Sequence, residues 1–198
     1  MSVWMGRKTL YCGTFALAFP LLLSCAAALI KNRSVRKKLL IAVFAAYICG
    51  MVYLTLAGRT SEQRLINLTP FWTYTATRDP QYRWQGYMNV FLFIPFGFML
   101  PWTAKRKFLP SLLIGFAFSV CIEAVQYLFA LGMCEFDDVF HNTLGTALGY
   151  GYWKGLRWVA ARCGQSVWNA LERIKECICR ISSQGLACLA NKWNRGRK

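Results

Sequence analysis

The stretch SVCIEAVQYLFALGMCEFDDVFHNTLGTALG, residues 119–149, decides how this chain is organised. It places a carboxylate, Glu123, inside an apolar run. An acidic connection at 134–138 follows, and a second apolar run then opens with His141 and Asn142. Polar side chains in hydrocarbon are costly unless they pair with one another or face a cavity. Their presence here therefore indicates a structural or functional site inside a membrane.

The composition is typical of a membrane protein. Of the 198 residues, 56% are hydrophobic and 16% are charged, whereas a soluble domain carries about 25% charged residues. The charges are gathered in short clusters between apolar runs, and several runs are long enough to cross about 30 Å of hydrocarbon. We therefore expect an all-α fold, a polytopic membrane helical bundle.

The apolar runs predict about five transmembrane helices, followed by a C-terminal amphipathic helix. The expected spans are residues 9–30, 39–57, 87–103, 108–131 and 139–161. Between 167 and 181, apolar residues recur at helical spacing, which is typical of a helix lying on a membrane surface. We divide the chain into a first span with its basic loop, a main transmembrane domain and a basic amphipathic tail: 1–38, 39–161 and 162–198.

The distribution of Lys and Arg predicts the orientation. Basic residues cluster at 31–38, at 105–107 and in the tail, and all three clusters fall on one side of a five-span chain. The positive-inside rule places that side in the cytoplasm. We expect the N-terminus outside the cell, the C-terminus in the cytoplasm, and the long connection 58–86 outside together with the acidic connection.

The net charge of +16 does not require a nucleic-acid partner. Basic loops serve as topology signals and contact anionic lipid, and the chain shows no recognised nucleic-acid motif. Membrane lipids are therefore the expected partners. The nine cysteines have neither the regular spacing of a disulfide framework nor that of a zinc site. We expect no metal and no cofactor.

The polar side chains of the opening stretch fall on two helical faces, one on each of its spans. Because the connection between the spans is short, the two helices should be antiparallel neighbours. Their polar faces then converge toward the outer leaflet, together with a polar residue of the third span. The converging residues are Ser119, Glu123, Gln126, Asp138, His141, Asn142 and, from the third span, Asn89.

Several of these residues also have a purely structural interpretation. The pair Gly145-x-x-x-Gly149 lets helix backbones approach closely. Asp137 and Asp138 stand at the start of a helix, where carboxylates cap amide donors and interact favourably with the helix dipole. Glu123 is the strongest functional candidate, since an intramembrane carboxylate is a functional hypothesis by default. A hydrogen bond to a neighbouring amide would make it structural instead.

Four blocks of sequence, in order, resemble the VanZ-like family. They are Asn67-Leu-x-Pro70-Phe71, Asn89-Val-x-Leu-x-Ile-Pro95-x-Gly97-x-x-Leu100-Pro101, Ser119-x-x-x-Glu123-x-x-Gln126 and Asp138-x-x-x-Asn142-Thr143-x-Gly145-x-x-x-Gly149-Tyr150, within about 40–152. Members of that family are bacterial integral membrane proteins, and the founding member is associated with low-level resistance to teicoplanin. The resemblance implies a bacterial plasma-membrane protein with a role in the cell envelope.

The chain departs from the family at one place. Members often carry an arginine shortly before the acidic connection, where this chain reads Gly132-Met133-Cys134. If that arginine binds an anion, Arg64, Arg78 or Arg83 would have to supply the contact here.

We hypothesise a non-enzymatic protein whose outer-leaflet polar pocket binds an envelope component, a lipid-linked precursor or a lipophilic glycopeptide. The expected ligand-binding residues are Asn67, Pro70, Phe71, Asn89, Ser119, Glu123, Gln126, Asp138, His141 and Asn142. Within this set, Glu123, Asn89 and Asn142 would form the pocket floor.

The alternative is a membrane-embedded enzyme acting on an envelope lipid or lipid-linked precursor. In that case Glu123 or His141 would be the general base, with Asp138 assisting. His141 has the near-neutral pKa that proton transfer requires. Transport is a third possibility, because transporters also use intramembrane carboxylates.

Overall fold

The computed structural model describes the backbone of residues 2–57, 64–77, 79–104 and 107–195, and side chains within 10–57, 64–77, 79–103 and 107–165. The chain forms two compact units, Met1–Trp153 and Lys154–Lys198. Every predicted site residue lies in the first, which we call unit 1. The predicted boundary at 38 falls within the helix Arg33–Leu56, and the predicted division of the chain stays a prediction.

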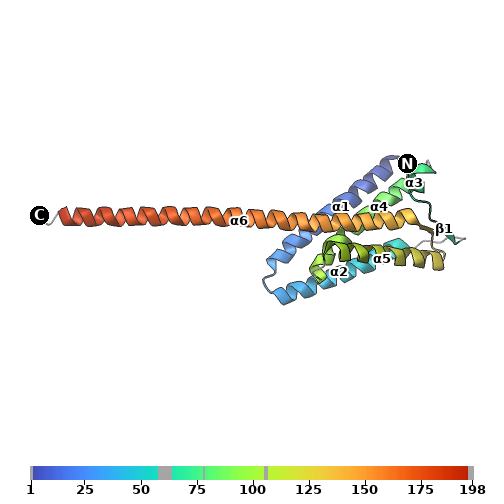
Figure 1. The fold of residues 1–198 in the computed structure, drawn as a ribbon, viewed down its shortest axis with the longest axis horizontal. Coiled ribbons are helices and arrows are strands. Elements are labelled where there is room, and N and C mark those ends of the chain that lie inside the picture. Colours follow the sequence, from blue (N-terminus) through green and yellow to red (C-terminus); the bar gives the residue numbers. More distant parts are fainter. Residues whose placement is uncertain (1, 58–63, 78, 105–106, 196–198) are drawn as a thin grey trace. The chain divides into compact units, whose positions relative to one another are not determined.

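The chain is mostly helical, as expected. In order, its elements are α1 (Ser2–Leu29), α2 (Arg33–Leu56), β1 (Leu65–Asn67), α3 (Trp72–Thr75), α4 (Pro80–Ala104), α5 (Phe108–Leu128), β2 (Met133–Glu135) and α6 (Phe136–Arg195) (Figure 1). The part of α6 up to Trp153 belongs to unit 1.

Three helices in the described part of the chain are long and apolar enough to cross a membrane. They are Leu10–Leu29, Arg33–Leu56 and Phe108–Leu128. The predicted third and fifth spans lie within α4 and α6, which are not among the three helices found in the described residues. The structure therefore supports a membrane protein, while the number of about five spans and the orientation of the termini stay predictions.

Helix α4 is the centre of unit 1. Every residue from 93 to 100 is buried, so the helix is enclosed on all sides there. A helix that is apolar all round is buried either by neighbouring elements or by lipid, and here neighbouring elements bury it. Helices α1, α2 and α5 pack against α4, and the core residues come from α2, α4 and α5: Met51, Phe93, Phe96, Leu100 and Ile122.

A tyrosine of α2 hydrogen-bonds the backbone of α4 close to its internal proline. Pro95 lacks an N–H and disturbs the hydrogen bonds of the preceding turn. The hydroxyl of Tyr47 donates to the carbonyl of Leu92 at 2.6 Å. This hydrogen bond links α2 to α4 three residues before Pro95.

Two glycines of α6 allow it to approach α4 closely. A Cβ atom at Gly145 would collide with the carbonyl oxygen of Val90, and one at Gly149 with that of Ile94. These contacts confirm that Gly145-x-x-x-Gly149 is a packing motif. Ser119 and Gly115 of α5 contact Asn142 and Thr146 of α6, which also confirms that these two helices are antiparallel neighbours.

Two helices begin earlier than expected because a side chain caps them. The Asn32 carboxamide oxygen accepts from the amides of Ser34 and Val35, at 3.0 and 3.2 Å, so the basic cluster after Asn32 lies in the first turns of α2. Asp79 accepts from the Gln81 amide at 2.9 Å, and Pro80 follows as the first helical residue of α4. An acceptor before a proline is a strong helix start.

The boundary between a fifth span and a separate tail helix stays a prediction. Helix α6 continues from Phe136 to Arg195. This range contains no proline, and isolated glycines do not stop a helix. The side chains of 167–181 lie outside the described residues, so the amphipathic face stays a prediction.

The structure also contains a parallel strand pair that we did not predict. Strands β1 and β2 pair in the register Leu65 with Met133, Ile66 with Cys134 and Asn67 with Glu135. Three-residue strands are too short to show an alternating pattern, so periodicity could not reveal them. This strand pair links the long connection 58–86 to the acidic connection 134–138.

We expect Gly149→Ala to destabilise unit 1 by about 1–3 kcal/mol, because the added methyl group overpacks the contact with α4. Gly151→Ala is the matched control, since a Cβ atom there has nothing within 4 Å. Thermal unfolding in a neutral detergent measures both variants. Equal melting temperatures for the two would contradict the close contact.

Candidate functional site

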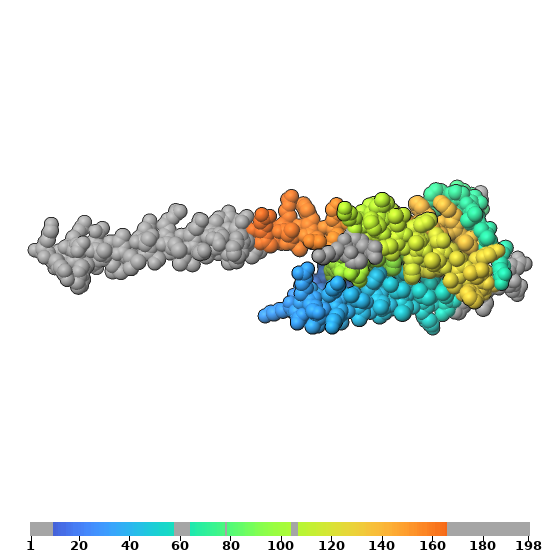
Figure 2. Space-filling view, turned by 60° about the horizontal axis from the view of Figure 1, so that its bottom comes forward, coloured from blue at the N-terminus to red at the C-terminus, as the bar shows by residue number. Residues whose placement is uncertain are grey.

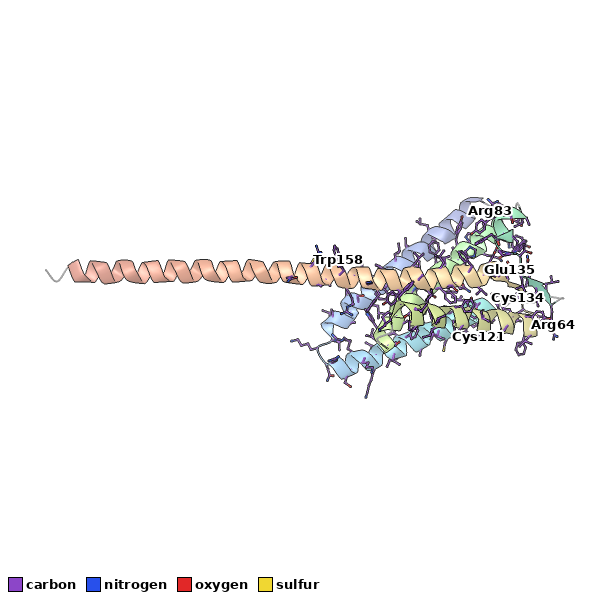
Figure 3. The ribbon with its side chains drawn as sticks, viewed as in Figure 1. Arg64, Arg83, Cys121, Cys134, Glu135 and Trp158 are labelled. Atoms are coloured by element: carbon purple, nitrogen blue, oxygen red, sulfur yellow. The ribbon has the colours of Figure 1, made fainter. Side chains whose placement is uncertain are left out.

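The candidate site lies at the end of unit 1 where the two connections meet, which we call the connector end. Figure 2 shows the teal residues of β1 and α3 and the yellow residues of the α5–α6 connection at this same end. The labelled side chains of Arg64, Arg83, Cys134 and Glu135 also lie there (Figure 3). Segments far apart in sequence therefore form one local structure.

Asp137 fixes the segment that carries α3. Its carboxylate oxygens accept from the backbone amides of Phe71 at 2.6 Å and Thr73 at 3.0 Å, and the side chain is 1% exposed. Phe71 has a φ of 56°, a left-handed conformation that is uncommon outside glycine. The hydrogen bonds that these amides donate to Asp137 stabilise the segment in this conformation.

Glu123 holds β2 against α5. It is 3% exposed and faces the interior of the bundle, and its Oε2 accepts from the backbone amide of Glu135 at 3.0 Å. The indole of Trp72 donates to the carboxylate of Glu135 at 3.0 Å. A carboxylate buried in α5 thus positions the acidic connection, which in turn contacts α3.

The other polar residues of α5 also bond to neighbouring segments. Ser119 accepts from the Asn142 amide nitrogen at 2.8 Å, and Gln126 donates to the carbonyl of Thr55 at 3.1 Å. Both α5 side chains are buried, so the expected polar face is confirmed as an interior face. The carboxamide oxygen of Asn142 is buried and has no hydrogen-bond partner among the described residues.

His141 is joined to α3 and lies against α4. Its Nε2 shares a hydrogen bond with the Tyr74 hydroxyl at 2.8 Å, and a Cβ atom at Gly86 would press on the imidazole ring. The ring lines a cavity of about 350 Å³ whose surface is almost entirely apolar. The lining residues of this smaller cavity are Tyr74, Tyr87, Val90, Phe91, Phe140, His141 and Leu144.

A larger cavity of about 760 Å³ extends from the connector end into the bundle. Its walls come from α1, α2 and α4, and its polar end is formed by β2 and the start of α6. The lining residues are Tyr11, Cys12, Phe15, Tyr47, Leu54, Thr55, Leu65, Tyr82, Trp84, Gln85, Met88, Asn89, Phe91, Leu92, Gly132, Met133, Glu135 and Asp138.

The predicted ligand-binding residues are divided between these features. Asn89 and Asp138 line the larger cavity and His141 lines the smaller one. Glu123 and Asn142 are not among the lining residues of these two cavities, and the expected pocket floor stays a prediction. Buried polar groups need hydrogen bonds, and these two bond to protein atoms between α5 and its neighbours. Their contact with a ligand stays a prediction.

The remaining predicted residues belong to the first connection. The Asn67 carboxamide accepts from the Thr69 amide at 3.0 Å, which shapes the chain after β1. Pro70 is exposed in the turn before α3, and Phe71 packs edge-on against Phe140 with ring centroids 5.1 Å apart. These residues shape the connector end without lining either cavity.

The residues proposed for an enzyme make different contacts, and their catalytic role stays a prediction. Asp138 lines the larger cavity, His141 lines the smaller one, and Glu123 bonds to the backbone of β2. Among the described residues, no group of three or more His, Cys, Asp or Glu side chains could hold a metal ion.

Sequence reasoning missed several residues of the larger cavity. Tyr82, Gln85 and Asn89 share one face of α4, because they are three and seven residues apart. Because we predicted that the span begins at 87, Tyr82 and Gln85 were not assigned to the helix. Asp79 followed by Pro80 is nevertheless a sequence signal for a helix start. Glu135 was missed because a single acidic residue in a connection carries no pattern.

The two described arginines at the connector end, Arg64 and Arg83, are not among the lining residues of the larger cavity. Arg64 precedes β1 and Arg83 lies in the first turn of α4 (Figure 3). Arg78, the third residue that we considered for replacing the family's arginine, lies outside the described residues.

A sequence model described as VanZ/LLP1 matches residues 44–158, more than half of the chain. The chain belongs to the VanZ/LLP1 family. Protein VanZ of Enterococcus faecium is 39% identical over 89 residues, which cover 44% of this chain and 52% of that protein. The match therefore spans about half the length of this curated relative. No solved structure matches.

The VanZ/LLP1 match includes most of the site but not all of it. It begins within α2 and continues into α6, so Asn89, Glu123 and Asp138 fall inside it. Helix α1 precedes the match, although Tyr11 and Phe15 line the larger cavity. The residues of α1 that line this cavity therefore precede the part of the sequence that the family model matches.

We expect Asp137→Ala to expose the amides of Phe71 and Thr73. Each hydrogen bond to a charged acceptor contributes about 1.5–3 kcal/mol, so both amides should exchange with deuterium at least about tenfold faster. Asp79→Asn is the control, because it removes a carboxylate while keeping a capping oxygen. Unchanged exchange in the region 71–73 would contradict the role of Asp137.

The pKa of the Cys134 thiol depends on the carboxylates at the connector end. Burial raises the pKa of Cys134, and the carboxylates of Glu123, Asp138 and Glu135 raise it further. The thiolate is the reactive form, so Asp138→Asn should lower this pKa and speed alkylation of Cys134 at neutral pH. Iodoacetamide labelling across a pH series, resolved by mass spectrometry, measures the shift. A pH profile identical to that of the native chain would contradict the effect.

Proposed function

We propose that this chain is a multi-pass protein of the bacterial plasma membrane that binds an amphiphilic molecule of the cell envelope in the larger cavity. The ligand would be an envelope component, a lipid-linked precursor or a lipophilic glycopeptide. The observation that carries the proposal is the combined chemistry of the cavity, which has apolar walls and a polar end.

The size and lining of the cavity support an amphiphilic ligand. Pockets for small molecules commonly measure about 300–1,000 Å³ and combine apolar walls with a few polar groups. The volume of about 760 Å³ falls in this range. Phe15, Leu54 and Leu92 provide the apolar wall for an alkyl or acyl chain, while Gln85 and Asn89 offer hydrogen bonds to a polar group.

The polar end of the cavity is preorganised, which favours binding. Glu123 holds β2 through its backbone, and Asp137 holds the segment around α3. Preorganised groups lose little conformational entropy when a ligand arrives. In this proposal Glu123 and Asp137 are positioning residues, and Asn89 and Asp138 contact the ligand.

The charge pattern supports an external opening. With the N-terminus outside and the C-terminus in the cytoplasm, the connector end would lie at the outer leaflet. An envelope molecule reaches a protein from that side. Together with membership of the VanZ/LLP1 family, this location supports a contribution to tolerance of lipophilic glycopeptides such as teicoplanin.

We expect expression of the chain in a sensitive bacterium to raise the inhibitory concentration of teicoplanin. Met88→Trp should abolish the increase, because a large ring at a lining position occupies the cavity. The comparison requires equal amounts of each variant in the membrane, measured by immunoblot.

Leu113→Trp is the matched control for the added ring. Leu113 is 57% exposed on α5 and lies outside both cavity linings, so this variant should protect as well as the native chain. Full protection by Met88→Trp would show that the cavity is not involved.

A further inference from the structure

The larger cavity takes its lining from two helices that diverge. Helices α1 and α2 follow one another in the chain and separate toward the connector end, and both pack on α4 (Figure 1). They touch through Phe19 and Tyr47, whose rings stack with centroids 5.8 Å apart. Nearer the connector end, Phe15 of α1 and Leu54 of α2 line the cavity, together with residues of α4. The cavity therefore lies in the angle between α1 and α2.

The packing of α1 on α4 leaves its cavity-lining residues at the side of the bundle. Ala16 is fully buried, and a Cβ atom at Gly13 would lie 3.4 Å from an aromatic ring of α4. Tyr11 and Phe15 line the cavity, yet they are 66% and 53% exposed. On α2, Leu54 also lines the cavity and is 66% exposed. Residues that both line a cavity and face outward form the rim of an opening.

This rim belongs to helices that are suited to cross a membrane. The segments Leu10–Leu29 and Arg33–Leu56 are long and apolar enough to do so, and they contain Tyr11, Phe15 and Leu54. Outward-facing apolar side chains of a spanning helix contact the acyl chains of the bilayer. The opening between α1 and α2 therefore faces lipid when these helices span the membrane.

The cavity also has the polarity of a lipid that stands in one leaflet. Gln85 and Asn89 line it toward the connector end, and Leu92 lines it one turn further into the bundle. The apolar wall continues on α1, where the rings of Phe15 and Phe19 stack with centroids 5.2 Å apart. A lipid likewise has its head group at the membrane surface and its chains toward the centre. It can therefore enter from the side without turning over.

We propose that the larger cavity opens sideways into the bilayer between α1 and α2 and takes a membrane lipid from it. The inference rests on the proposed function and specifies the class of its ligand and the route of entry. The head group lies near Gln85 and Asn89, and an acyl chain passes the rim between Phe15 and Leu54. A chain that travelled through water would lose its hydrophobic stabilisation on the way, whereas this route keeps it in apolar surroundings.

The methionines of the chain allow a direct test. Met88 and Met133 line the larger cavity, whereas Met51 and Met99 are each 1% exposed in the core. The full chain is produced with photo-methionine, a diazirine analogue of nearly the same size, and is reconstituted in bilayers of phosphatidylethanolamine and phosphatidylglycerol. After illumination and digestion, mass spectrometry locates the lipid adducts and identifies the lipid from their mass. We expect adducts at Met88 and Met133, and none at Met51 or Met99.

Two neighbouring substitutions on α2 test the route. Leu54→Gln places an amide on the rim and removes apolar contact with a passing chain, so it should lower the yield of adducts at Met88 and Met133 at least about threefold. Tyr53→Gln is the matched control, because Tyr53 is 70% exposed and is not among the lining residues. This variant should keep the native yield. Both positions are exposed, so neither substitution disturbs the core.

Dihexanoyl phosphatidylglycerol, which is soluble in water, tests entry from the connector end. It is added to the same bilayers before illumination. If it labels Met88 and Met133 equally in the native chain and in Leu54→Gln, and the bilayer lipids do not label them, the lateral route is overturned while amphiphile binding stands.

The remaining outcomes are also decisive. Adducts of bilayer lipids whose yield is the same in the native chain and in Leu54→Gln would overturn the opening between α1 and α2. Equal labelling of Met51, Met88 and Met99 would overturn it as well, because the lipid would then not be confined to the cavity. Absence of adducts of every lipid at Met88 and Met133 would overturn this inference and the proposed function together.

Discussion

Buried carboxylates that accept hydrogen bonds from backbone amides hold this structure together at the connector end. Asp137 binds the amides of Phe71 and Thr73, and Glu123 binds the amide of Glu135. A buried charge is costly unless it is hydrogen-bonded, and these bonds supply partners for it. They also bring two distant connections into one local structure, on which the polar end of the larger cavity depends.

Helix α4 is central to the bundle and has a polar first part and an apolar middle. Residues 93–100 are enclosed by other helices, and the Tyr47 hydroxyl of α2 donates to the Leu92 carbonyl of α4. Gly145 and Gly149 let α6 pack directly on the α4 backbone. The first turns of α4 consequently face the larger cavity with Gln85 and Asn89, while its middle forms the core.

Much of the bundle was predictable because hydrophobicity and small residues act over short sequence distances. The apolar runs predicted the helices, the spacing of Ser119, Glu123 and Gln126 predicted an interior polar face, and Gly145-x-x-x-Gly149 predicted close packing. The expected pocket floor stays a prediction. Helical spacing predicts which side chains lie on the same face of a helix, but it does not predict the hydrogen-bond partner of each side chain.

Length, composition and periodicity alone determined that this is a helical membrane protein with its polar residues gathered on the faces of two neighbouring helices, because those features depend on local spacing and on transfer from water. The three-dimensional fold decided that Asp137 and Glu123 bind backbone, that β1 pairs with β2, and that Asp138 shares a cavity with Asn89. These pairings join residues more than forty positions apart or depend on a three-residue strand, so no local pattern encodes them.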